Sequence, residues 1–141
     1  MKRFNLIFIS LMIFRFGLSY SQITELRYEN LNGACDFESH QLIANSKDEL
    51  RKFSGCNFLK FDFNRYTIIG VKGSSPGHFN PVINFRILKD DHNKKVTIEV
   101  LFSGGKTCNC RVVKPLYKRM IYVDKIEDDY NFEFKSVNTD D

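Results

Sequence analysis

Four cysteines are the residues of this chain best suited to covalent or metal chemistry: Cys35, Cys56, Cys108 and Cys110. Cys108 and Cys110 are two positions apart, so a strand would place both thiols on one face. Three arrangements are compatible with that spacing. Each thiol could pair with a distant cysteine, the two could bond to each other, or both could join Cys35 and Cys56 around a metal ion.

The spacing favours structural disulfides over the other arrangements. A four-cysteine metal site usually contains two close pairs, whereas Cys35 and Cys56 lie 21 positions apart (56 − 35). A catalytic dithiol normally has Cys-x-x-Cys spacing at a helix N-terminus, which stabilises the thiolate. We therefore expect two disulfides with their pairing left open, and no metal ion or other cofactor.

The other side chains capable of acid–base or nucleophilic chemistry form no recognisable catalytic pattern. The three histidines, His40, His78 and His92, lie in polar or turn-like segments with no nucleophile beside them in the sequence. The chain contains no Gly-x-Ser-x-Gly motif. The acidic clusters at 90–91 and 127–129 lack the ligand spacing and glycine of a calcium loop. The sequence therefore predicts a protein that is not an enzyme.

Residues 1–21 have the pattern of a cleavable secretory signal peptide. A basic start is followed by an uncharged apolar run that ends before Arg15, and Ser19 and Ser21 are the small residues expected before a cleavage site. The run is too short for a membrane-spanning helix, which needs about 20 apolar residues. We expect a mature chain that begins at Gln22, has no stable membrane insertion, and is periplasmic or secreted.

Removal of residues 1–21 leaves a nearly neutral chain. Three of the 21 basic residues lie in that segment and none of the 17 acidic ones, so 18 − 17 leaves a net charge of about +1. Residues 114–119 are the only basic cluster with an aromatic side chain, which is too little to predict a nucleic-acid partner. The remaining 120 residues (141 − 21) suit one domain, 22–141, and an even number of exported cysteines suits disulfides.

The elements that position these residues are mostly strands. Alternating apolar residues at 82–88 and 96–102 predict a hairpin with a turn at 90–93. Ser46 and Glu49 form a capping box that begins a short helix over about 46–54. Strands are also expected at 66–71, 108–113, 120–123 and 132–134, and weaker extended patterns occur at 23–30 and 37–44. Together they predict an antiparallel β-sandwich or barrel of six or seven strands with one flanking helix.

Residues 58–135 resemble the C-terminal domain of the PrcB family. The segment 61–71 is similar to the family's Asp-Phe-Ser-Lys-type segment and the strand that follows it. Residues 76–79 resemble its Pro-x-Gly-Gly-Tyr loop, and 115–117 and 123–125 resemble its Pro-Tyr strand and Val-Pro-Lys ending.

The chain departs from that family pattern at three positions. His78 stands in place of a glycine, Phe79 in place of the tyrosine and Asp124 in place of a proline. The resemblance implies a β-domain of an exported accessory protein, a subunit or modulator of an envelope or secreted protease complex rather than a catalyst. The partner would be another envelope or secreted protein.

A more distant likeness, to the chagasin-type inhibitors of cysteine proteases, concerns the loops. Those proteins are small exported β-sandwiches that present three loops, and 74–78, 104–106 and 114–117 occur here in a similar order. The loop residues that could bind a partner are Pro76, Gly77, His78, Phe79, Gly104, Gly105, Pro115 and Tyr117.

The order of turns predicts how these loops are arranged. Because the turn at 90–94 lies between the loops at 73–80 and 103–107, we expect those two loops at the same end of the sandwich. Phe79 either forms an exposed pair with His78 or packs beneath its own turn. The sequence thus predicts an exported interaction protein. A protease inhibitor, or a small envelope enzyme or redox protein using Cys108 and Cys110, is the alternative.

Overall fold

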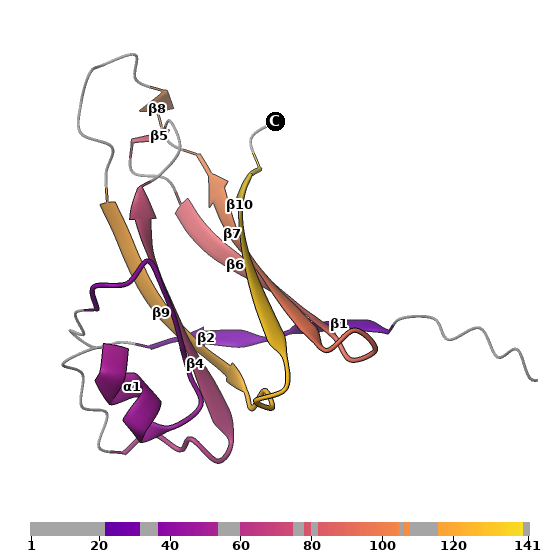
Figure 1. Ribbon diagram of the computed structural model, residues 1–141. Helices are drawn as coiled ribbons and strands as arrows, with labels where there is room; N and C mark the ends of the chain where they lie inside the picture. The colour runs from indigo at the N-terminus through magenta and orange to yellow at the C-terminus, as the bar shows by residue number, and fades with distance from the viewer. Residues whose placement is uncertain are drawn as a thin grey trace, which may run out of the picture.

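The computed structural model places the chain in two four-stranded β-sheets that face each other, with one short helix outside them (Figure 1). The structure describes residues 22–31, 37–53, 60–74, 78–79, 82–104, 106–107 and 116–139. The expected signal segment and all four cysteines lie outside these residues, so cleavage and disulfide formation stay predictions. The expected fold class is confirmed, as a sandwich and not a closed barrel among the described strands.

The first sheet is mixed rather than purely antiparallel. Its strand order is β1 (Ile23–Leu26), β6 (Val82–Asp90), β7 (Lys95–Ser103) and β10 (Asn131–Asn138). The expected hairpin is confirmed, since β6 and β7 pair antiparallel from Val82–Ser103 to Asp90–Lys95. In contrast, β10 runs parallel to β7, with Asn131 beside Lys95. Residues 125–130 carry the chain from the other sheet and enter this one where β7 also starts, which makes the pair parallel.

The second sheet is antiparallel throughout. Its strand order is β2 (Tyr28–Asn30), β9 (Leu116–Asp124), β4 (Tyr66–Ser74) and β3 (Gln41–Ala44). The expected strand 23–30 is wrong as a single element, because it divides at Arg27 into β1 and β2, which belong to different sheets. Two further strands, β5 (His78–Phe79) and β8 (Lys106–Thr107), pair only with each other.

The described part of the chain therefore contains ten strands, not six or seven. Strands of two residues are too short to show any periodicity in the sequence, and a strand that changes sheet keeps one continuous extended pattern. Both effects lower the number of strands that a pattern can predict.

Apolar side chains from both sheets form the main core between them. In β7, Val96, Ile98 and Phe102 are fully buried and alternate with half-buried residues. They pack against Ile69 of β4 and Ile121 of β9. Burying one such side chain stabilises the fold by roughly 1.5–3 kcal/mol, so this layer supplies most of the apolar free energy.

A second, smaller core covers the outer face of the second sheet. Leu50 of helix α1 (Lys47–Phe53) packs there with Phe37, Leu42 and Ile68. Both faces of β4 are thus covered, which explains why its residues from 67 to 71 are all buried. Gly70 suits this layer because a Cβ there would lie 3.2 Å from a ring carbon of Phe37, closer than most such contacts.

The expected capping box of α1 is confirmed with one difference. The Ser46 hydroxyl accepts a hydrogen bond from the Glu49 N–H at 3.2 Å. The Glu49 carboxylate accepts from the N–H of Asn45 at 2.6 Å, one residue before the cap. The side chain of Glu49 therefore also binds the backbone at the end of β3.

Candidate binding groove

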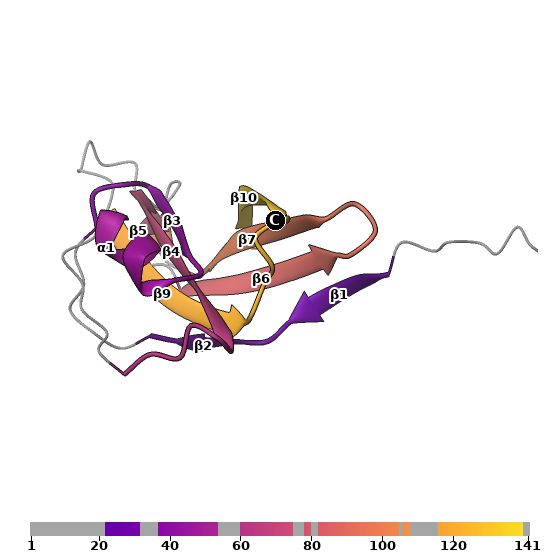
Figure 2. The same cartoon turned by 60° about the horizontal axis from the view of Figure 1, so that its bottom comes forward.

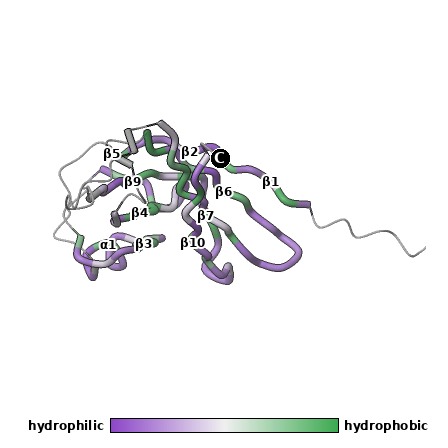
Figure 3. The backbone as a smooth tube through the Cα atoms, turned by 90° about the horizontal axis from the view of Figure 1, so that it is seen from above, coloured by the Kyte–Doolittle hydropathy of each residue, from purple (hydrophilic) through white to green (hydrophobic). Residues whose placement is uncertain are grey.

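The two long sides of the sandwich are closed differently. On one side β1 and β2 are joined through Arg27, so the chain itself passes from sheet to sheet. On the other side the border strands are β10 and β3, which are far apart in sequence (Figures 2 and 3). We call the opening between these two strands the β3–β10 groove.

Two cavities lie along this groove. The first has a volume of about 320 Å³, and Val71, Val100 and Tyr117 line it together with Phe134 and Ser136 of β10. The second has a volume of about 490 Å³, and its lining includes Ile43 of β3 and Phe132 of β10. Each cavity thus has β10 along one wall, and apolar core side chains reach into the first.

The backbone of β10 exposes hydrogen-bonding groups to the groove. The N–H of Asn131 donates to the carbonyl of Lys94 at 2.8 Å, and the N–H of Thr139 donates to that of Phe102 at 2.9 Å. In a parallel ladder, successive residues direct their backbone N–H and C=O groups alternately to the two sides of the strand. The odd-numbered residues of β10 therefore point these groups at β7. The N–H and C=O groups of Phe132, Phe134 and Ser136 point the other way, and within the described part of the chain they have no hydrogen-bond partner.

The facing edge of β3 is shorter, and side chains bind its backbone at or near its two ends. The N–H of Lys72 donates to the carbonyl of His40 at 2.9 Å, so the groups of Gln41 and Ile43 point into the groove. The Ser39 hydroxyl donates to the carbonyl of Gln41. Beyond Ile43, the N–H of Asn45 is bound by Glu49, and its carbonyl accepts from Lys125 Nζ at 2.7 Å.

Charged side chains cover the outer face beside β10. Glu133 Oε2 forms ion pairs with Lys95 Nζ at 2.7 Å and with Lys135 Nζ at 3.3 Å. These two contacts, that with Lys95 first, hold the pKa of Glu133 below its usual value. Glu133 and Lys135 are both about half-exposed and neighbour the open edge, so they would face any strand added to it.

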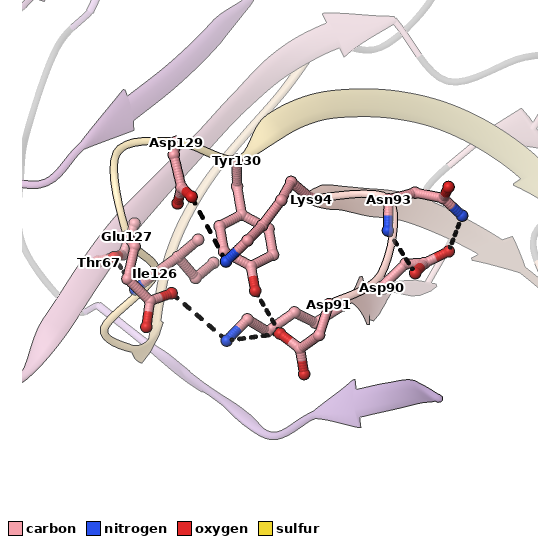
Figure 4. Close-up of polar contacts among 10 residues, drawn as sticks. Thr67, Asp90, Asp91, Asn93, Lys94, Ile126, Glu127, Asp129 and Tyr130 are labelled. Carbon is pink, nitrogen blue, oxygen red and sulfur yellow. Dashed lines mark hydrogen bonds and ion pairs between the residues drawn. The ribbon is translucent and has the colours of Figure 1, made fainter. Parts of the chain in front are cut away.

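A polar cluster fixes the start of β10 (Figure 4). We call it the Tyr130 cluster; its members are Lys89, Asp91, Lys94, Glu127, Asp129 and Tyr130. The buried Tyr130 donates its hydroxyl proton to Asp91, and its ring lies between two ammonium groups. Lys89 Nζ is 4.8 Å and Lys94 Nζ 4.6 Å from the ring centroid, within range of a cation–π contact.

Each charged member of the Tyr130 cluster has an opposite charge beside it. Lys89 Nζ lies 3.2 Å from Asp91 and 3.4 Å from Glu127, and Lys94 Nζ lies 3.4 Å from Asp129. Partial desolvation opposes the charge of Lys89, but its contacts with Asp91 and Tyr130 outweigh it and raise its pKa. The hydrogen bond from Tyr130, and then that from Lys89, lowers the pKa of Asp91. The cluster therefore joins the β6–β7 turn to the β9–β10 connection.

Thr67 links the two borders of the groove. It is fully buried in β4, and its hydroxyl accepts from the N–H of Ile126 at 2.9 Å. The same hydroxyl donates to the side-chain oxygen of Asn45 at 2.5 Å. The Asn45 amide nitrogen in turn donates to Asp128 at 2.8 Å. The end of β3 and the segment leading into β10 are thus held by one network.

The described parts of two of the loops that the sequence singled out lie together, as predicted. β5 pairs antiparallel with β8, so the segments that follow β4 and β7 lie side by side (Figure 1). Pro76, Gly77, Gly105 and Pro115 lie outside the described residues, and only the backbone of His78 and Phe79 is described. The predicted alternatives for the Phe79 ring, exposed or packed beneath its turn, therefore lie outside the described side chains. Gly104 has φ of +64°, which suits the predicted turn.

Tyr117 corrects the third predicted loop. β9 begins at Leu116, so Tyr117 is a strand residue that pairs with Gly73. Its ring packs against Phe102 with centroids 5.3 Å apart, and burial raises its pKa. A proline two residues earlier marked the end of a loop, and the strand starts immediately after it.

No pattern in the sequence indicates the groove. Alternation predicts 132–134 as a strand, but it cannot indicate which neighbours a strand has. Among the histidines whose side chains the structure describes, His40 borders the groove, with Nδ1 3.2 Å from the carbonyl of Lys72.

Three further findings are negative, and the first two concern the described residues. They contain no cluster of three or more histidine, cysteine, aspartate or glutamate side chains that could hold a metal ion. No helix among them is long and apolar enough to span a membrane. Comparison with protein-family models, curated proteins and solved structures finds no match to this chain.

Proposed function

We propose that this chain is an exported, non-enzymatic interaction protein that binds an extended polypeptide segment along β10. The observation that carries the proposal is the open edge of β10 beside two cavities. Phe132, Phe134 and Ser136 offer N–H and C=O groups that no described residue satisfies. An extended segment can add to such an edge as a further strand, with its backbone supplying the missing partners.

The cavities supply a means of choosing among segments. Side chains of an added strand alternate between the two faces, and those on one face are about 6.6 Å apart along the strand. One set would therefore enter the groove, where Val100 and Tyr117 offer an apolar surface. The other set would lie beside Glu133 and Lys135. We expect a segment with apolar residues at alternate positions.

The resemblance to the PrcB family supports an accessory role in an envelope or secreted protease complex. A segment of a protease, or of another subunit, is the kind of partner that strand addition would hold. The alternative, an inhibitor of the chagasin type, is favoured by one observation, the pairing of β5 with β8, which brings two of the three loops together. That alternative would use the loop end and leave β10 free.

Site-specific photo-crosslinking in the producing cells separates these possibilities. A photoreactive residue in place of Val137, beside the open edge, should give a covalent adduct. The same residue in place of Thr24 of β1, on the opposite border of that sheet, is the control and should not. Equal adducts at both positions, or none at Val137, would contradict strand addition at β10.

A matched pair of variants tests the backbone contribution. Ser136→Pro removes an N–H that points away from β7, so it should abolish the Val137 adduct without removing a ladder hydrogen bond. Ser136→Ala keeps that N–H and should crosslink as the unchanged chain does. Amide hydrogen exchange gives an independent measurement: bound partner should slow exchange at Phe134 and Ser136. An adduct that survives Ser136→Pro, with exchange unchanged, would sink the proposal.

A further inference from the structure

We infer that the strand that pairs with the open edge of β10 is β10 of a second copy of this chain. The two strands would run antiparallel and be related by a two-fold axis at Phe134. The inference rests on the proposed function, because it uses the same edge. Its result would be one continuous sheet across two copies, in the order β1-β6-β7-β10-β10-β7-β6-β1. Self-complementary interfaces of this kind are the usual form of a homodimer.

The backbone pattern of β10 fits this register. In an antiparallel pair, residues that face each other with their backbone groups exchange both hydrogen bonds. A two-fold axis at Phe134 places Phe134 opposite Phe134 of the partner subunit, and Phe132 opposite Ser136 of the partner subunit. These are the residues of β10 whose N–H and C=O groups point away from β7. Each outward group would therefore find its partner.

The charges of β10 fit the same register. Glu133 would lie opposite Lys135 of the partner subunit, and Lys135 opposite Glu133 of the partner subunit. Both positions are non-hydrogen-bonded pairs, in which opposing Cα atoms are about 4.5 Å apart and side chains are closest. Opposite charges at directly facing positions stabilise an antiparallel pair, and like charges destabilise it.

The charges also disfavour the neighbouring registers. Sliding one strand by two residues keeps the backbone pattern, but it puts Glu133 opposite Glu133 of the partner subunit. Sliding it the other way puts Lys135 opposite Lys135 of the partner subunit. Only the register centred on Phe134 has opposite charges at both positions. The sequence Phe-Glu-Phe-Lys-Ser at 132–136 is thus complementary to itself when reversed.

Pairing would also cover the apolar rim of the groove. The side chains of Phe132 and Phe134 belong to the inward face of β10 and are only half-buried. In the pair, Phe134 would contact its counterpart across the axis. Aromatic cross-strand pairs of this kind add to the stability of a sheet.

Sedimentation analysis of the mature chain over a concentration series tests the inference. We expect a reversible monomer–dimer equilibrium, because the proposed contact is a single pair of strands and interfaces smaller than about 1,200 Å² are usually transient. Glu133→Lys and Lys135→Glu each replace two attractive facing pairs by two repulsive ones, and each alone should weaken dimerisation by roughly tenfold or more. An equimolar mixture of the two variant chains should restore association, as a heterodimer.

Three controls make each outcome decisive. Arg86→Glu reverses a charge on the same outer face but two strands from the edge, so it should dimerise as the unchanged chain does. Ser136→Pro should remain monomeric while Ser136→Ala dimerises. Thermal unfolding of every variant shows that it is folded.

The results distinguish the inference from the proposed function. A chain that is monomeric at every concentration, or a mixture of charge variants that does not associate, overturns the second copy as occupant. If the Val137 adduct then contains a different protein, strand addition stands with another partner. If Val137 gives no adduct and the chain is monomeric, both fail.

Discussion

The two strands that border the β3–β10 groove present different edges to it. β3 has four residues, and side chains of Ser39, Glu49 and Lys125 bind the backbone at or near its ends. β10 has eight residues, and its outward groups from Phe132 to Ser136 have no partner among the described residues. Proteins usually shorten or cap an exposed edge because it can pair with another chain. The contrast indicates that β10 offers the longer unpaired edge to another chain.

The difference follows from what precedes and follows each strand. β3 leads directly into α1, whose first turn places Glu49 within reach of the strand end. β10 follows the connection 125–130, whose side chains are engaged in the Tyr130 cluster and the Thr67 network. Those contacts fix where β10 starts beside β7, and they leave its other edge uncovered.

The largest expected effect separates the two edges of β10 itself. Lys135→Pro removes an N–H that donates to β7, so it should lower the free energy of unfolding by roughly 2–4 kcal/mol. Ser136→Pro removes an N–H that points into the groove, and it should cost less than about 1 kcal/mol. Chemical denaturation of both variants measures the difference. Equal losses would mean that the assigned alternation of β10 is wrong.

Thr67→Val tests the network that holds both borders of the groove. The variant is nearly isosteric but leaves the buried N–H of Ile126 without its acceptor, which should cost about 1–3 kcal/mol. Thr97→Val, on the half-buried outer face of β7, is the matched control and should change the free energy of unfolding by less than about 0.5 kcal/mol. A loss no greater than in the control would show that the network does not support the fold.

Glu49→Ala tests the side-chain contact that binds the backbone just after β3. It removes the acceptor for the Asn45 N–H and one half of the capping box, at an expected cost of about 1 kcal/mol. Hydrogen exchange at Asn45 should become faster, whereas exchange at Phe134 should not change. Faster exchange at both sites would show that the two edges are not independent.

The smallest effect concerns acid. Because the pKa of Asp91 is lowered in the folded chain, its ionised form contributes stability above the ordinary aspartate pKa. That contribution is lost as the pH falls through the folded pKa. The Asp91→Asn variant should therefore lose less stability than the unchanged chain between neutral pH and about pH 3. Unfolding curves over that range measure the difference. Equal losses of stability in the two proteins would show that the Asp91 carboxylate does not help to fix the start of β10.

Local sequence patterns predicted the elements that depend only on residues close together in the chain. The hairpin of β6 and β7 follows from period-two alternation, and α1 follows from Ser46 and Glu49. The order of the turns predicted that the loops at 73–80 and 103–107 share one end of the sandwich, and β5 and β8 from these loops do pair. Tyr117 was misplaced in a loop because a preceding proline gives no information on how soon a strand begins.

By itself the sequence determined a mainly β sandwich with one capped helix, because side-chain periodicity and capping act within a few residues of the chain. Only the tertiary structure decided that β10 lies parallel to β7 at a border, facing β3 across a groove. A strand has the same alternating pattern whether it is central or at an edge, since the pattern reports its faces and not its neighbours. The complementary charges of Glu133 and Lys135 were present in the sequence throughout. They indicate pairing between two copies of β10 only when its unpaired side is known, because pairing depends on which backbone groups point outward.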